Sequence, residues 1–129
     1  MKHLAIFRGF LAEDILAGKK TIESRFSKRH DPPFGVISAG DLVYVKPAGK
    51  DIIGQFRVKK VIFFDGLDSA DLNQIKERYN DQICADTDYW QSHKEAKYGT
   101  LIFIDEYQSF ITSPVRISKK DLRGWVVLG

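Results

Sequence analysis

The sequence predicts an α+β fold, a small mixed β-barrel of five or six strands with two or three flanking helices. Three observations favour this class: segments with the period of two typical of strands predominate, the helical segments lie in the connections between strands, and no β–α–β alternation runs through the chain. A chain of 129 residues without an internal repeat fits one domain, which we assign to residues 1–129.

The beginning of the chain predicts a strand, a short helix and a second strand. Leu11 and Ile15 fall four residues apart, as they do on one face of a helix. Gly18 is placed to end this helix in the left-handed conformation, which leaves Lys19–Lys20 near the negative end of its dipole. The expected elements are a strand at His3–Arg8, a helix at Phe10–Ala17 and a strand at Lys20–Phe26.

The rest of the chain predicts further strands with two helices between them. Ser27–Gly35 is expected to be a loop because of its two prolines and polar side chains, and Gly54 marks a bulge or bend in a long strand. The second helix is expected to face Tyr89 and Trp90 inward. The expected strands are Asp41–Lys46, Asp51–Phe64, Thr100–Tyr107 and Trp125–Leu128, with an edge segment around Phe110 and a break at Pro114, and the helices are Asp68–Tyr79 and Asp86–Lys97.

The composition excludes several classes of protein. The one cysteine, Cys84, cannot form an internal disulfide, and the three histidines have no metal-ligand spacing, so we expect neither a metal nor a cofactor. No apolar run approaches the ~18 residues of a membrane span, and the N-terminal segment lacks the clean apolar region of a signal peptide. A cytoplasmic protein without a membrane partner is therefore expected.

The net charge of +3 is distributed unevenly along the chain. Residues 1–60 hold twelve Lys and Arg against six Asp and Glu, whereas residues 61–129 hold eight against eleven. The positive first half favours a nucleic acid or another phosphate-bearing partner.

The segment GKKTIESR, residues 18–25, concentrates charged side chains at the start of a predicted strand. In an extended chain Glu23 and Arg25 share one face, and Ile22 points to the other face, toward the core. One interpretation is an ordinary surface ion pair on a solvated strand. The other is a site, in which the carboxylate accepts a proton or a base-edge hydrogen bond while the guanidinium and Lys20 bind phosphate or carbonyl oxygen.

Other candidate residues have weaker support from their surroundings. Arg8 and Lys46 end two predicted strands, either as side chains lining the same end of the barrel or as solvated strand ends. Ser24 has no histidine nearby in the sequence, so a Ser-His-Asp site is not expected. The aromatic side chains are enough to stack a base, but most lie in predicted strands or on helix faces where core packing is favoured.

The stretch DILAGKKTIESR resembles the ASCH domains, a family of PUA-like β-barrels recognised by a helix that ends in Gly and continues as GxKxxExR. All four fixed positions of this pattern are present, at Gly18, Lys20, Glu23 and Arg25. IFRGFLAEDILAG is similar to the family's opening strand and helix, and DLVYVKPAGKDIIGQFRVKKV to its paired barrel strands. YWQSHKEAKYGTLIFIDEYQSF followed by PVRISKKDL is similar to the closing half of many members.

The resemblance implies a cleft between the barrel and the first helix that carries Lys20, Glu23 and Arg25 and binds RNA or its nucleotides. One branch of the family hydrolyses N4-acetylcytidine with a lysine, a threonine three residues later and a distant acid. Lys20 matches the lysine, but Glu23 stands at the threonine position, so the activity of that branch is not carried over. The candidates for the distant acid are Glu77, Asp81 and Asp86.

The sequence supports three hypotheses for function. The first is a binding module for RNA or a modified nucleotide, whose ligand-binding residues are Arg8, Lys20, Glu23, Arg25 and Lys46. The second is a nucleoside or RNA hydrolase, acting on an acylated nucleobase such as N4-acetylcytidine or cleaving RNA, in which Lys20 and Glu23 form the acid–base pair. The third is a structural or interaction barrel in which the motif only closes the fold.

Overall fold

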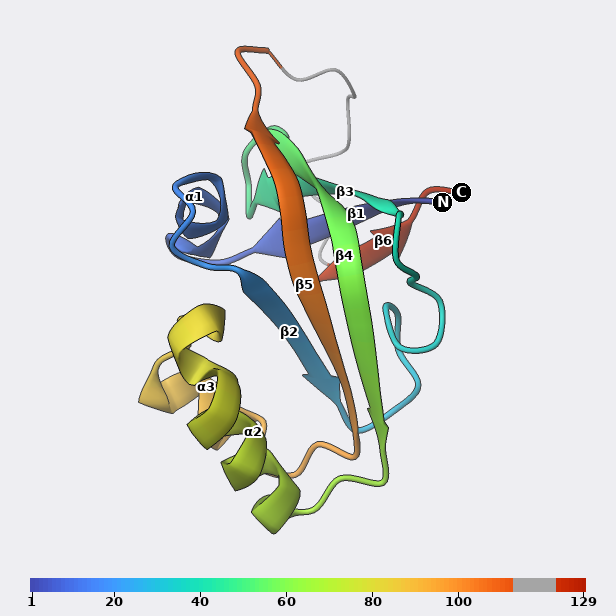
Figure 1. Ribbon diagram of the computed structural model, residues 1–129, viewed down its shortest axis with the longest axis vertical. Helices are drawn as coiled ribbons and strands as arrows, with labels where there is room; N and C mark the ends of the chain where they lie inside the picture. Colours follow the sequence, from blue (N-terminus) through green and yellow to red (C-terminus); the bar gives the residue numbers. More distant parts are fainter. Residues whose placement is uncertain (113–122) are drawn as a thin grey trace.

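A computed structural model describes residues 1–112 and 123–129, which form one six-stranded sheet and three helices (Figure 1). This architecture confirms the α+β fold and the small mixed barrel expected from the sequence. The strands are β1 Lys2–Phe7, β2 Ile22–Ser27, β3 Leu42–Pro47, β4 Gly54–Asp65, β5 Tyr98–Ser109 and β6 Trp125–Val127. The helices are α1 Leu11–Leu16, α2 Ser69–Ile83 and α3 Thr87–Ser92.

The sheet is mixed and curls into an open half-barrel. Its strand order is β2-β5-β4-β3-β1-β6, in which only β1 and β3 run parallel. The long strands β4 and β5 form the long wall of the half-barrel (Figure 1). Their register shifts between Gln55 and Arg57 and again between Val58 and Lys60. Such irregularities bend and twist a strand pair, which brings the edge strands β2 and β6 toward each other.

Gly54, the expected bulge, has a different reason for being glycine. A Cβ atom there would lie 2.5 Å from the backbone oxygen of Gln108 and 2.7 Å from a methyl carbon of Leu16. The register shift itself comes one residue later. Gly54 is therefore required for the close approach of β5 and α1 to the start of β4.

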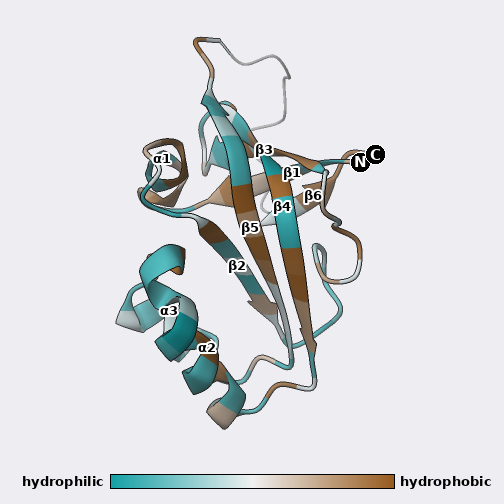
Figure 2. Ribbon diagram, viewed as in Figure 1, coloured by the Kyte–Doolittle hydropathy of each residue, from teal (hydrophilic) through white to brown (hydrophobic). Residues whose placement is uncertain are grey.

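The two larger apolar clusters of the described residues lie on the two faces of the curled sheet. The inner cluster fills the half-barrel, and the outer cluster lies between the sheet and the pair α2 and α3, whose exposed surfaces are hydrophilic (Figure 2). β2 contributes to both faces, because Ile22 and Phe26 pack in the outer cluster while Glu23 pairs in register with Ile102 of the inner one. The expectation that Ile22 points into a core, away from Glu23, is confirmed.

Several boundaries differ from the sequence expectations. α2 runs one turn beyond the expected end at Tyr79, to Ile83. Cys84, which has a positive φ of 61°, ends the helix. α3 stops at Ser92 instead of Lys97. The expected break at Pro114 lies outside the described residues, and Phe110 bonds Ile53 without joining a strand. Among the described residues, no helix is long and apolar enough to span a membrane.

Candidate functional site

The GKKTIESR segment begins with a turn that depends on glycine. Gly18 has a φ of +77°, as expected, and its N–H donates to the carbonyl oxygen of Ile15 in α1. A Cβ at this position would also lie 2.8 Å from the hydroxyl of Tyr107. The positive φ favours glycine at this position, and after the turn the side chain of Lys20 is directed toward the end of α2.

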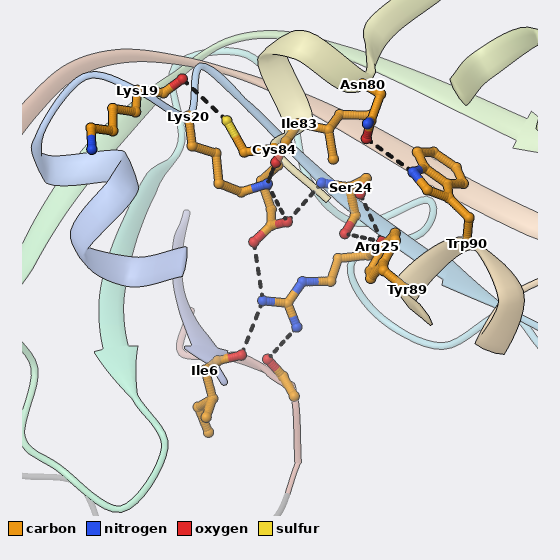
Figure 3. A network of polar contacts seen from close by, with 12 residues as sticks. Ile6, Lys19, Lys20, Ser24, Arg25, Asn80, Ile83, Cys84, Tyr89 and Trp90 are labelled. Carbon is orange, nitrogen blue, oxygen red and sulfur yellow. Dashed lines mark hydrogen bonds and ion pairs between the residues drawn. The ribbon is translucent and has the colours of Figure 1, made fainter. Parts of the chain in front are cut away.

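Lys20 lies at the C-terminus of α2, and its side chain is buried with 2% of its surface exposed. Its Nζ donates to the carbonyl oxygen of Ile83, the last residue of that helix, and lies 3.5 Å from Glu23 Oε1 (Figure 3). The last turn of α2 contains no basic residue of its own. The ammonium group of Lys20 therefore serves the negative end of this helix, and not of α1 as the sequence suggested.

Glu23 is also buried, at 4% exposure, and both of its carboxylate oxygens have partners. Oε1 accepts the backbone N–H of Ser24 at 2.7 Å, and Oε2 lies 3.3 Å from an Nη atom of Arg25. With Lys20 on one side and Arg25 on the other, the carboxylate is compensated by two cations.

Arg25 connects the two edges of the curled sheet. One Nη donates to the carbonyl oxygen of Ile6 in β1 at 3.1 Å, and the other donates to that of Gly124, just before β6, at 3.0 Å. The guanidinium also lies over the rings of Phe7 and Trp125, 5.1 and 5.2 Å from their centres. Figure 3 shows the side chain reaching from β2 to Ile6. Its contacts thus span the open side of the half-barrel.

Ser24 and Tyr89 form a second polar pair beside this network. The hydroxyl of Tyr89 donates to the backbone oxygen of Ser24 at 3.0 Å, so Ser24 Oγ donates to it at 2.7 Å. Burial raises the pKa of Tyr89 above its usual value, and the nearby carboxylate of Glu23 raises it further. Tyr89 is therefore a neutral hydrogen-bond donor at this site and not a base.

A pocket of about 460 Å³, here called the motif pocket, opens beside this network. Arg8 is exposed at the pocket, and three of the five expected ligand-binding residues, Arg8, Glu23 and Arg25, line it. Sequence reasoning missed the contribution of α3, because nothing in the local pattern indicates which residues 65 positions away will face β2. The described residues that line it are Ile6, Phe7, Arg8, Leu11, Glu23, Ser24, Arg25, Phe26, Tyr89, Ser92, His93 and Gly124.

Lys46 is not brought to the motif pocket. It pairs in register with Ile6 in the middle of the sheet, and alternation along β3 places it on the same side as Tyr44, which belongs to a third apolar cluster. Its exposure is 1%, and its Nζ has no hydrogen-bond partner within residues 1–112 and 123–129.

The candidates for a distant acid do not line the motif pocket either. Glu77 and Asp81 are exposed on α2. Asp86 caps the N-terminus of α3, where its carboxylate accepts the N–H of Tyr89 at 2.8 Å. In the part of the chain that is described, no group of three or more His, Cys, Asp or Glu is placed to hold a metal ion.

A curled, mixed half-barrel sheet with three helices is consistent with a PUA-like barrel, and solved structures with a similar fold are known. The ASCH protein from Zymomonas mobilis superposes with a TM-score of 0.65 at 17% identity, over 84% of this chain and 69% of that one. Protein EF3133 from Enterococcus faecalis V583 superposes with a TM-score of 0.55 at 14% identity, over 83% and 75% of the two chains.

A third solved structure, the hypothetical protein PH0355, has a TM-score of 0.57 at 20% identity and covers 81% of this chain and 98% of its own. No protein-family model matches the sequence, and no curated protein matches it significantly. The chain has an ASCH-like fold. At these identities the likeness defines the fold and leaves the ligand to be argued from the site.

Proposed function

We propose that the protein binds RNA or a modified nucleotide in the motif pocket. The observation that carries this proposal is the position of Arg25. Its guanidinium is fixed by backbone carbonyls, and 22% of the Arg25 side chain is still exposed. A guanidinium has more donors than these contacts use, and a fixed one binds phosphate or carbonyl oxygen with little loss of conformational entropy. Arg8, exposed at the same pocket, adds a second positive charge.

The other charged groups of the motif, Lys20 and Glu23, support this site by holding Arg25 in place. Lys20 is buried at the end of α2 and does not line the motif pocket, so its contribution is to neutralise Glu23. Glu23 in turn orients Arg25. Single strands and loops of RNA are the targets that fit, because unstacked bases can enter a small pocket.

The salt dependence of RNA binding tests this proposal. Affinity of a labelled pool of random-sequence RNA hexamers, measured by fluorescence anisotropy from about 50 to 200 mM NaCl, should fall steeply with salt. Arg8→Ala should weaken binding. It should also make the slope of log affinity against log salt shallower by about one, the effect of losing one phosphate contact. Arg78→Ala, which removes an exposed arginine of α2 outside the motif pocket, is the matched control. Equal affinities and slopes for wild type and Arg8→Ala would contradict the proposal.

A hydrolase remains a second candidate because Glu23 is the one carboxylate among the described residues that line the motif pocket. Lys20 Nζ bonds a helix carbonyl instead, so the expected acid–base pair has only one member at the pocket. Incubation with N4-acetylcytidine and with single-stranded RNA, beside a Glu23→Gln variant, separates the two functions. Turnover that the substitution leaves unchanged would exclude Glu23 as the base.

A further inference from the structure

A second pocket, here called the loop pocket, lies on the other side of Arg25. Its volume is about 710 Å³, and its outer walls come from the loop Asp31–Phe34 and from β6 with the two residues before it. Arg25, Phe26 and Gly124 line both pockets. The bridge from Arg25 to Gly124 is therefore a shared wall, with a ligand-sized space on each side.

The outer edge of β2 carries backbone groups that pair with no other strand of the described sheet. Ser24 directs its N–H to Glu23 Oε1 and its carbonyl oxygen to Tyr89, so both groups point away from β5. Alternation along the strand gives Phe26 the same orientation, and in the described sheet β2 has no neighbour except β5. The N–H and C=O of Phe26 thus offer one donor and one acceptor between the two pockets, a pattern that suits the edge of a base.

The loop pocket also contains an aromatic ring held in place. The half-buried ring of Phe34 packs against Phe63 at 5.5 Å and against Tyr98 at 5.2 Å between ring centres. A ring fixed in this way can stack a base without losing rotamer freedom. The exposed carboxylate of Asp31 lines the same pocket and can accept a hydrogen bond from an exocyclic amino group.

We propose that the two pockets are successive subsites for one single strand of RNA, with Arg25 between them facing the connecting phosphate. This inference rests on the proposed function and specifies its ligand, which is at least a dinucleotide and not an isolated nucleoside. The base in the loop pocket stacks on Phe34, and the neighbouring nucleotide occupies the motif pocket. A mononucleotide fills one subsite only and forgoes the contacts of the other.

Chain length of the RNA is the variable that tests the inference. Equilibrium affinities are measured for the four nucleoside monophosphates, for a mixed pool of dinucleotides and for the random hexamer pool. We expect dinucleotides to bind at least about tenfold more tightly than any mononucleotide. Phe34→Ala should weaken dinucleotide binding by about five- to 150-fold, the range for loss of one stacked base, and remove most of the gain over mononucleotides.

Two further variants separate binding from folding. Asp31→Ala removes the acceptor at an exposed position and should weaken dinucleotide binding while leaving thermal unfolding unchanged. Phe10→Ala removes a phenylalanine that is 80% exposed and lines neither pocket, so it should leave all affinities unchanged.

The outcomes distinguish this inference from the proposed function. RNA binding that depends on Arg8 but is equally tight for mononucleotides and dinucleotides would overturn the two-subsite arrangement and leave the function standing. The same holds if neither Phe34→Ala nor Asp31→Ala changes the affinity of dinucleotides. No binding of any RNA length by the wild-type protein would overturn both.

Discussion

The edge strand β2 and the inner pair β1–β3 each contain a buried lysine, and the two lysines are treated differently. Lys20, just before β2, has 2% of its surface exposed, and its ammonium group has a helix carbonyl and a carboxylate as partners. Lys46 in β3 has 1% exposed, and its ammonium group has no hydrogen-bond partner in the described part of the chain. The two lysines are equally buried but have opposite effects on the stability of the fold, because a buried charge stabilises a fold only when it is compensated.

The acidic groups of the two regions are both compensated, but by different kinds of partner. Glu23 is shared between two cations. Asp41, at the start of β3, accepts from His3 Nε2 at 2.8 Å, from the backbone N–H of Ser38 at 3.0 Å and from the N-terminal amino group of Met1 at 3.4 Å. Trp125 Nε1 donates to His3 Nδ1, which leaves the imidazole proton on the nitrogen that faces Asp41.

The largest expected effect is that of Lys20→Met. It leaves Glu23 buried with one cation fewer and removes the donor to the end of α2, so we expect a loss of about 3 to 5 kcal/mol in the free energy of unfolding. Urea denaturation measures it. Lys19→Met, the same change at the exposed neighbour, should stay within about 0.5 kcal/mol of wild type. Similar losses in both variants would remove the distinction between the two positions.

Asp41→Asn tests the acidic group of the β1–β3 region. Burial acts to raise the pKa of Asp41, but hydrogen bonds from His3 and Ser38 and the N-terminal amino group outweigh it, so the pKa lies below its usual value of 3.8. The unfolded chain then binds the proton more readily, and stability is lost as the pH falls through the folded pKa. We expect Asp41→Asn to cost about 1.5 to 3 kcal/mol at neutral pH and to lose less on acidification below pH 3.8 than wild type.

Thermal and urea unfolding at pH 7 and at steps below pH 4 measure this difference. Asp65→Asn, at an exposed position that ends β4, is the matched control. Parallel acid limbs for wild type and Asp41→Asn would show that Asp41 does not contribute to acid sensitivity.

Lys46→Met should act in the opposite direction from Lys20→Met. It replaces a buried ammonium group that has no partner among the described residues by an apolar side chain of similar length, and we expect a gain of about 1 to 3 kcal/mol. Lys50→Met, at an exposed position, should change little. If Lys46→Met destabilises the protein, the ammonium group has an essential partner and the comparison of the two lysines fails.

Tyr89→Phe is the smallest of the four changes. Loss of the hydroxyl that donates to Ser24 should cost about 0.5 to 1.5 kcal/mol at pH 7. Because burial and Glu23 raise the pKa of Tyr89, its contribution is present below pH 10 and is lost as the pH rises through the folded pKa. Unfolding measured from pH 8 to above pH 10 should therefore show a steeper alkaline loss in wild type than in Tyr89→Phe. Coincident alkaline limbs would argue against this role.

Much of the fold follows from the sequence because its causes are local. Period-two alternation located the strands, and the left-handed Gly18 followed from its place after a short helix. The length of α2 did not follow, since its end depends on Cys84 adopting a positive φ, which non-glycine residues seldom do. The reason for Gly54 also escaped, because the atoms that exclude a Cβ come from distant elements.

The candidate site is predictable only in part, because several of its contacts come from residues that are distant in the sequence. The alternation of β2 placed Glu23 beside Arg25 correctly. The partner of Lys20 lies 63 residues away, and that of Arg25 at Gly124 lies 99 residues away, so neither could be read from a local pattern. The sequence likewise could not show that Lys46, on the same side of β3 as Tyr44, stays outside the motif pocket.

The bridge made by Arg25 also bears on how the molecule avoids its own copies. In the described sheet β2 and β6 are the two edge strands, and edges with unpaired backbone groups are templates for pairing with another chain. Arg25 joins these edges through side-chain hydrogen bonds. A closed barrel would have backbone hydrogen bonds between strands at the same place. Loss of the Arg25 side chain would expose the backbone groups of both edge strands to other copies of the chain. Damage at this position would therefore first become visible as intermolecular aggregation.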